Sequence, residues 1–297
     1  MARVANTSTQ RGTTIERSPV TAFPYRAAGK LWMRFGSSWF VCTASMIKKG
    51  VLVTAAHCVH NYGLGVAGFA DEVHFYPANV SSSTTVAQPY GKFVGRRIFV
   101  PAPYRNGTDT CEVVGIVCNN DVAVVVLRER NGLQAGDLVG WYGYGANGYS
   151  FIASSEFGGG TVADITQLGY PVAWDNGYQM QRGNSFGKLY TTTIGGKALL
   201  NTELGSAMTG GSSGGPWIVN FGTNPTITGT ASAGTAADRL VVVGTTSWGY
   251  TSTGPKVQGA SWFGQNAQFP LVDYGGHGPG NIGALVNAAC TAYPTAC

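Results

Sequence analysis

The chain has 297 residues, of which 11% are charged, and a formal net charge of +5. Its basic residues are scattered, with Lys48-Lys49 and Arg96-Arg97 as the only doublets, whereas a nucleic-acid-binding protein would show a basic stripe. The longest apolar stretch, residues 122–127, has the length of a strand. We therefore expect no nucleic-acid partner and no association with a membrane.

The composition favours an all-β protein. There are 44 glycines, and Thr, Ser, Val and Tyr are common, which suits short strands joined by tight turns. Only near the C-terminus do apolar residues recur with the period of a helix. Residues 281–290 predict a short C-terminal helix with Asn281 as N-cap and with Ile282, Leu285 and Val286 on one face.

In chain order, the first stretch is polar. Residues 1–20 predict a flexible N-terminal arm or a propeptide remnant, and they show no signal-peptide pattern. Charge and glycine at residues 128–132 mark a boundary, so we place one lobe at residues 21–130 and a second at residues 131–297. The strands predicted in the first lobe are residues 31–35, 39–47, 51–54, 73–77, 93–100 and 122–127.

The second lobe repeats the pattern of short apolar runs broken by glycine. Residues 251–280 are rich in glycine and predict no element. The strands predicted in this lobe are residues 141–145, 165–171, 179–181, 187–193, 217–219 and 240–246.

Six cysteines form three pairs that are close in sequence. An even number with local spacing predicts a disulfide framework and an oxidising compartment outside the cell. A zinc site would need C-x-x-C pairs or adjacent histidines, so we predict no metal and no other cofactor. The predicted pairs are Cys42 with Cys58, Cys111 with Cys118, and Cys290 with Cys297.

Residues 210–216 form a glycine-rich loop around Ser213. Glycines on both sides of a serine allow turns that other residues do not adopt. A hydroxyl on such a turn suits an acyl-transfer nucleophile, with the N–H groups of Gly211 and Ser213 as the oxyanion hole. The alternative is a Gly/Ser loop on the surface.

His57 and Asp121 each stand next to an apolar strand. A disulfide at Cys58 would fix where His57 points, although His57 could also be a purely structural histidine. Asp121 precedes residues 122–127, where a partly buried carboxylate needs a partner such as a histidine N–H. Alternatively, Asp121 only caps the turn before that strand.

Taken together, the three residues favour a catalytic triad. A serine hydroxyl needs a base within hydrogen-bond reach, and the base needs a third group that holds its tautomer. His57 could take the proton of Ser213, and Asp121 could accept from the other ring nitrogen. The order His, Asp, Ser along the chain matches one known arrangement of the triad.

The chain resembles the chymotrypsin-fold serine proteases. The signature segments of that family are similar to residues 54–58, 120–124 and 211–216. A finer likeness, to the secreted V8-like (glutamyl endopeptidase-like) branch, lies in residues 23–31, 168–171 and 209–211. The likeness spans about residues 20–250, and it implies two antiparallel six-stranded β-barrels with the triad in the cleft between them.

The resemblance also implies where a substrate binds. One segment of the family pairs with the substrate backbone as an added strand, and a second forms the pocket for the side chain before the scissile bond. The substrate-binding residues implied in this way are Ala207, Met208, Thr209, Ser247, Trp248 and Gly249.

Some positions depart from the family pattern. Ser212 stands where animal relatives carry an Asp that pairs with a new N-terminus, so activation by that ion pair is not expected. Thr246 and Met208 disfavour cleavage after Glu, and Ala207 disfavours cleavage after Lys or Arg. We therefore predict a small or apolar side chain before the scissile bond.

These observations predict a secreted serine endopeptidase that acts through an acyl-enzyme on protein or peptide substrates, as a monomer. Two alternatives use the same chain differently. One is a catalytically silent, protease-like protein that binds protein partners with its cleft, and the other is an esterase with the same triad.

Overall fold

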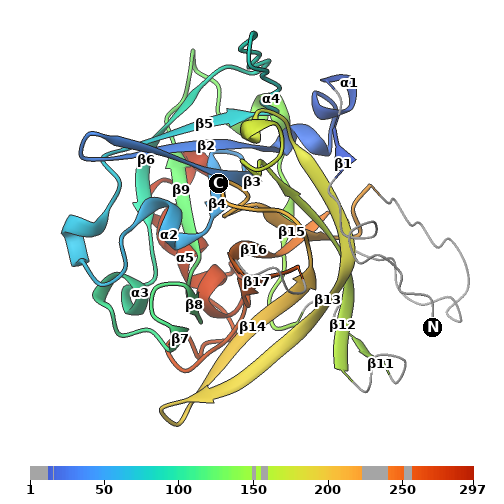
Figure 1. The fold of residues 1–297 in the computed structure, drawn as a ribbon. Helices are drawn as coiled ribbons and strands as arrows, with labels where there is room; N and C mark the ends of the chain where they lie inside the picture. Colours follow the sequence, from blue (N-terminus) through green and yellow to red (C-terminus); the bar gives the residue numbers. More distant parts are fainter. Residues whose placement is uncertain (1–12, 16, 149–151, 155–159, 223–239, 251–255) are drawn as a thin grey trace, which may run out of the picture.

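Figure 1 shows the chain as a computed structural model, in which most elements are β-strands. The structure describes residues 13–15, 17–148, 152–154, 160–222, 240–250 and 256–297. Residues 1–12 and 16 of the predicted N-terminal arm lie outside the described residues, as do residues 251–255 of the glycine-rich stretch 251–280.

Six strands in the first half of the chain form a closed barrel. The barrel order is β2-β3-β4-β9-β6-β5, with every neighbouring pair antiparallel. Gly36, at φ +58°, turns the β2–β3 hairpin. The strands are β2 Ala28–Phe35, β3 Ser38–Lys48, β4 Val51–Thr54, β5 Glu72–Pro77, β6 Phe93–Phe99 and β9 Ala123–Leu127.

Six strands of the second half close in the same way. Strand β12 pairs with β13 on one side and with β15 on the other, and the circle runs on through β14, β17 and β16. The prediction of two six-stranded antiparallel barrels is therefore confirmed. The strands are β12 Gly160–Gly169, β13 Gln181–Ile194, β14 Lys197–Gly205, β15 Pro216–Val219, β16 Val241–Gly249 and β17 Val257–Ser261.

Short elements connect and extend the barrels. Strands β1, β10 and β11 add to the second sheet, and β7 pairs with β8. The short strands are β1 Thr13–Thr14, β7 Cys111–Val113, β8 Val117–Cys118, β10 Gly143–Tyr144 and β11 Ile152–Ser154. The short helices are α1 Arg17–Val20, η1 Tyr25–Ala27, α2 Ala56–Val59, η2 Gly65–Gly68, α3 Ala102–Asn106, α4 Ala135–Val139, η4 Asp175–Gly177 and η6 Pro294–Ala296.

The C-terminal helix α5, Gly280–Ala292, packs in the core that both barrels share. Its buried face includes Ile282, Leu285 and Val286, as predicted. The predicted N-cap is wrong, because the cap position lies two residues earlier, at Pro279, which makes no side-chain cap bond. Asn281 is instead fully buried, where its amide donates to the carbonyl oxygens of neighbouring loops.

The described part of the predicted N-terminal arm packs against the second barrel. Thr13 and Thr14 pair with β13, and Ile15 and Val20 are buried in the shared core. Ile15 and Val20 therefore have a structural role, although residues 1–20 as a whole are mostly polar.

All three predicted disulfides are present. Cys42–Cys58 ties β3 to α2, Cys111–Cys118 joins β7 to β8, and Cys290–Cys297 links α5 to the chain end. The longest helix has 13 residues, and no helix in the described part of the chain has the length and apolar character needed to cross a membrane.

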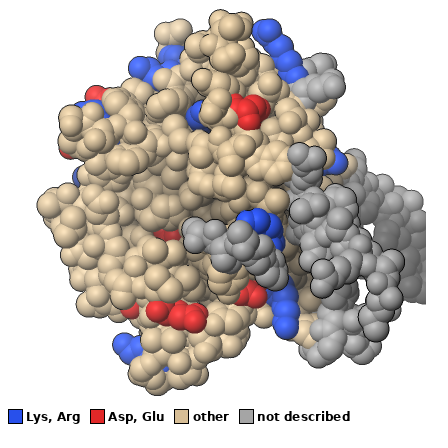
Figure 2. Space-filling view, viewed as in Figure 1, with Lys and Arg blue, Asp and Glu red and all other residues tan. Residues whose placement is uncertain are grey.

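Charged side chains are sparse on the face shown in Figure 2. Lys and Arg lie apart from one another, mostly near the edge of this view, and much of its centre is uncharged.

Candidate active site

The His57 ring is held from two directions. Strand β4 ends at Thr54, the one-turn helix α2 follows, and the Cys42–Cys58 disulfide ties that turn back to β3. The His57 backbone N–H donates to Asp121 Oδ1 at 2.8 Å, and Nδ1 lies 2.7 Å from Asp121 Oδ2. Because a carboxylate only accepts, Nδ1 carries the proton, and the neutral ring leaves Nε2 free to take one.

Asp121 is completely buried at the start of the strand that becomes β9. Besides the two bonds from His57, its Oδ2 accepts a very short hydrogen bond from the Ser247 hydroxyl. Its backbone N–H donates to Ser261 Oγ at 2.9 Å. A buried carboxylate needs several donors, and the second barrel supplies one of them, Ser247 on β16, while Ser261 on β17 holds the Asp121 backbone.

The environment of His57 acts on its pKa in two directions. Burial lowers the pKa of His57, whereas the charge of Asp121 and the hydrogen bond to it raise it. The two contributions of Asp121 together outweigh burial, so the pKa of His57 lies above its usual 6.5.

The Ser213 loop is fixed by close backbone packing. Gly211 has φ +93°, and a Cβ there would lie 2.4 Å from the Tyr170 carbonyl oxygen. The Gly210 carbonyl accepts from Val172 N–H at 2.8 Å. Since C=O and N–H point in opposite directions across a trans peptide, this bond turns the Gly211 N–H away from Val172.

Three N–H groups of this loop are without a hydrogen-bond partner among the described residues: those of Gly210, Gly211 and Ser213, of which the last two are the predicted oxyanion hole. The Ser213 carbonyl, in contrast, accepts from Thr43 N–H at 2.7 Å, and the Gly211 carbonyl accepts from Thr43 Oγ1 at 2.8 Å. A pair of free N–H groups beside a hydroxyl is able to bind a developing oxyanion.

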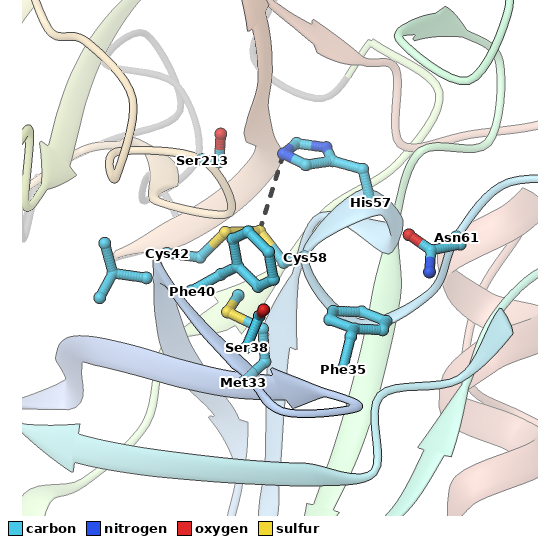
Figure 3. Close-up of a pocket in the computed structure, with 10 residues that line it drawn as sticks. Met33, Phe35, Ser38, Phe40, Cys42, His57, Cys58, Asn61 and Ser213 are labelled. Atoms are coloured by element: carbon cyan, nitrogen blue, oxygen red, sulfur yellow. Dashed lines mark hydrogen bonds between the residues drawn. A yellow bond between two sulfur atoms is a disulfide. The ribbon is translucent and has the colours of Figure 1, made fainter.

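Ser213 lies where two cavities meet. The first has a volume of about 460 Å³ and holds Ser213 and His57 side by side, as Figure 3 shows. No hydrogen bond joins these two side chains in the structure, and His57 Nε2 lies 3.8 Å from Cys58 Sγ. Other residues lining this cavity are Met33, Phe35, Ser38, Phe40, Val41, Cys42 and Asn61.

The second cavity, of about 370 Å³, contains all six predicted substrate-binding residues. The Met208 side chain packs against Gly169, and the Trp248 indole N–H donates to Asn201 Oδ1 at 2.8 Å. Strand β15 pairs with β16 only as far as Thr245, so the described structure leaves the edge of residues 247–249 without a strand partner on that side.

The sequence analysis did not identify several residues that surround the site. Thr43, Gln258 and Ser261 are buried polar residues whose partners lie far away in the chain, and no local pattern marks them. Asp109 accepts from Asn120 N and Nδ2 at 2.8 and 2.7 Å and so fixes the residue before Asp121. Burial raises the pKa of Asp109 to about 6, which its hydrogen bonds counteract only in part.

Two groups of residues in the described structure have the spacing of a metal site, Cys42/His57/Cys58 and Asp109/Cys111/Cys118. In both, the sulfur atoms belong to disulfides. Metals in proteins bind the thiolate, which a disulfide does not offer, so neither group fits a metal.

Similar sequences occur in bacterial proteases. A protein of Bacillus subtilis (strain 168) described as an extracellular metalloprotease is 29% identical over 178 residues, which are 59% of this chain and 50% of the relative. A glutamyl endopeptidase of Bacillus licheniformis is 30% identical over 161 residues, 54% of this chain and 41% of the relative. The chain thus spans about half, or less, of the length of these relatives.

Solved structures of proteases share the fold. Protease Anisep from Arthrobacter nicotinovorans has a TM-score of 0.59 at 23% identity and covers 84% of this chain and 94% of its own. A Glu endopeptidase solved in complex with MPD has a TM-score of 0.56 at 18% identity and covers 97% and 98%. At these identities the likeness establishes the fold alone.

A family model described as Trypsin matches residues 15–261, a range that includes both barrels and all three residues of the predicted triad. The predicted resemblance to chymotrypsin-fold serine proteases is confirmed by this match, and the glutamyl endopeptidase relative supports the V8-like branch. The chain belongs to the trypsin family of serine proteases.

Proposed function

We propose that this protein is a secreted serine endopeptidase that cleaves peptide bonds through Ser213, His57 and Asp121. One observation carries the proposal. A fully buried Asp121 holds His57 by two hydrogen bonds, 2.7 and 2.8 Å long, in the cavity that also contains Ser213. An imidazole oriented by a carboxylate next to a serine is the arrangement that activates a hydroxyl.

The reaction would proceed in two halves. His57 Nε2 takes the proton as Ser213 Oγ bonds to the substrate carbonyl carbon, and Asp121 stabilises the imidazolium that forms. The N–H groups of Gly211 and Ser213 bind the resulting oxyanion. The tetrahedral intermediate then expels the amine, which receives the proton from His57, and water hydrolyses the acyl-enzyme by the same steps.

The positions of the two cavities indicate the direction in which a peptide substrate would run across the site. The leaving amine must lie near His57, which protonates it, so the chain after the scissile bond would occupy the cavity of Figure 3. The chain before the bond would lie along residues 247–249 and pair with their open edge as an added strand. This places the side chain before the scissile bond in the second cavity.

Three disulfides support action outside the cell, because such bonds persist in oxidising compartments. The Bacillus subtilis relative is described as extracellular, which points to the same location. We expect the protein to act as a monomer.

The proposal is tested with a fluorophosphonate probe, which reacts with activated serines. We expect labelling of Ser213, loss of labelling in Ser213→Ala, and a fall in kcat of about 10⁶-fold in that variant. Ser83→Ala, which changes an exposed serine outside the site, should keep both labelling and turnover.

If the folded, oxidised protein is not labelled, the proposal of an enzyme is wrong. A catalytically silent relative that only binds partners would then be favoured. Faster turnover of an ester than of the matching amide is expected of any such triad, so the decisive comparison is whether the amide is cleaved at all. An enzyme that cleaves only the ester would be an esterase.

A further inference from the structure

A buried glutamine, Gln258, lines the second cavity. Gln258 lies on β17 directly opposite Gly249 of β16, is only 5% exposed, and lines the same cavity as Ser213. A Cβ added to Gly249 would lie 3.1 Å from Gln258 Cγ, so the glutamine side chain runs along the space that Gly249 leaves open. The space that the second cavity offers a substrate side chain therefore depends on residue 258.

The amide of Gln258 is held by hydrogen bonds to three neighbouring segments. Nε2 donates to the Met208 carbonyl at 2.9 Å and to Ser212 Oγ at 3.3 Å. Oε1 accepts from Gln167 Nε2 at 2.5 Å and faces Ser206 Oγ at 3.3 Å. Both amide protons of Gln258 are therefore used, whereas Oε1 has one firm donor, Gln167 Nε2.

The partners behind Gln258 are occupied as well. The second N–H of Gln167 donates to Thr246 Oγ1 at 2.8 Å, and that oxygen also accepts from Trp217 Nε1 at 2.9 Å. Ser206 Oγ donates to Gln167 Oε1 at 2.7 Å. The side chains of Gln258, Gln167, Ser206 and Thr246 thus form one hydrogen-bonded network without a charged group.

We propose that Gln258 is a specificity-determining residue, which makes this cavity accept an uncharged side chain before the scissile bond and reject charges of both signs. The inference rests on the proposed function. A carboxylate or ammonium group beside Gln258 would lose hydration and meet a neutral amide in place of an opposite charge, which is costly. Lys256 is the one charged residue among the described lining residues, and it is exposed, so water and salt weaken its effect.

The first measurement uses the wild-type protein and a peptide series that varies only the residue before the scissile bond. We expect kcat/KM for uncharged residues to exceed that for Asp, Glu, Lys and Arg by about 100-fold, the size typical of an unpaired buried charge. A profile dominated by acidic or by basic residues would overturn the proposal.

The second measurement uses Gln258→Glu, which keeps the shape of the side chain and adds a negative charge to the lining of the second cavity. We expect the ratio of kcat/KM for Lys over Leu to rise at least about tenfold, and to rise further with pH as the buried carboxyl ionises. Gln181→Glu is the matched control, because Gln181 is a buried glutamine of β13 that does not line the cavity. Its Lys-to-Leu ratio should equal that of the wild type.

Fluorophosphonate labelling separates the possible failures. If Ser213 is labelled and peptides are cleaved but Gln258→Glu and Gln181→Glu have the same profile, the inference about Gln258 is wrong and the proposed function stands. If the wild type neither reacts with the probe nor cleaves any peptide, both proposals are overturned. All rates are divided by the concentration of labelled sites, so that misfolded protein does not count. If Gln258→Glu does not fold, the wild-type peptide profile decides the test.

Discussion

At the residue scale, one buried carboxylate determines both the direction of the His57 ring and its proton affinity. Asp121 accepts from the backbone and from Nδ1 of His57, which leaves Nε2 on the side of the Ser213 cavity. Its charge raises the pKa of His57 more than burial lowers it. The same pair thus orients the proposed base and sets the pH range in which its ring is neutral.

The pH dependence of activity follows from this shift. The base must be neutral, so kcat/KM should rise with pH and reach half its maximum above pH 6.5, where the raised pKa of His57 lies. Stability has the opposite sign, because the raised pKa stabilises the fold fully below pH 6.5 and this contribution is lost as pH rises through the folded-state pKa. A pH–rate profile with a midpoint below 6.5 would contradict the role given to Asp121.

Replacing the carboxylate separates its two effects. In Asp121→Asn the attraction is gone and burial remains, so the pKa of His57 should fall, while kcat drops by about 10⁴-fold because the tautomer is no longer held. Asp164→Asn on β12 changes an exposed carboxylate and serves as control, with both quantities unchanged. The measurement is the pH–rate profile together with the histidine titration followed by NMR.

At the element scale, the loop between β14 and β15 depends on backbone conformations that side chains would prevent. Gly211 combines a positive φ with close contact to the Tyr170 carbonyl, whereas a Cβ at Gly210 would meet no atom within 4 Å. Two adjacent glycines therefore differ in what they tolerate, although the sequence shows them as equal.

These glycines provide a matched pair of variants. Gly211→Ala should displace the N–H groups that face the oxyanion and lower kcat by about 10²- to 10³-fold. Gly210→Ala should keep activity within a few-fold, since open space surrounds its Cβ. Equal activities of the two variants would show that the Gly211 backbone does not contribute to catalysis.

The elements that the sequence analysis missed have physical explanations. Strand β14 contains Ala, Leu and Glu, which favour helices, and it is a strand because β13 and β17 pair with both of its edges. Strand β17 lies in a glycine-rich stretch without alternation. The stretches predicted as residues 179–181 and 187–193 contribute to one long strand, β13, because β12 and β14 pair along it.

At the scale of the whole molecule, Thr43 joins the two barrels at the site. It lies fully buried on β3 of the first barrel, and its hydroxyl donates to the Gly211 carbonyl and accepts from Tyr170 N–H at 3.0 Å. Its own N–H donates to the Ser213 carbonyl. The position of the loop relative to His57 therefore depends on a contact between the barrels.

Removing this hydroxyl should affect stability and turnover together. Thr43→Val leaves the Tyr170 N–H without its partner, so we expect a loss of about 1–3 kcal/mol in the free energy of unfolding and a lower kcat. Thr43→Ser keeps the hydroxyl, loses about 0.8 kcal/mol for the missing methyl group, and should keep kcat. Urea unfolding and steady-state kinetics measure both effects, and equal kcat values in the two variants would contradict this role for Thr43.

We could predict the all-β class, the three disulfides and the three residues of the proposed triad from the sequence alone, because each has a local signature. Cysteines paired within a short span, a histidine beside Cys58, an aspartate before an apolar strand and a glycine-flanked serine are all visible within a few residues.

The contacts that hold these groups in place could be identified only in the folded protein. Ser261 is 140 residues from Asp121, Thr43 is 168 residues from Gly211, and Gln258 is 91 residues from Gln167. A polar residue that is buried against a distant partner looks in the sequence like any surface Ser, Thr or Gln, since its partner is chosen by the closure of the barrels and not by its neighbours in the chain.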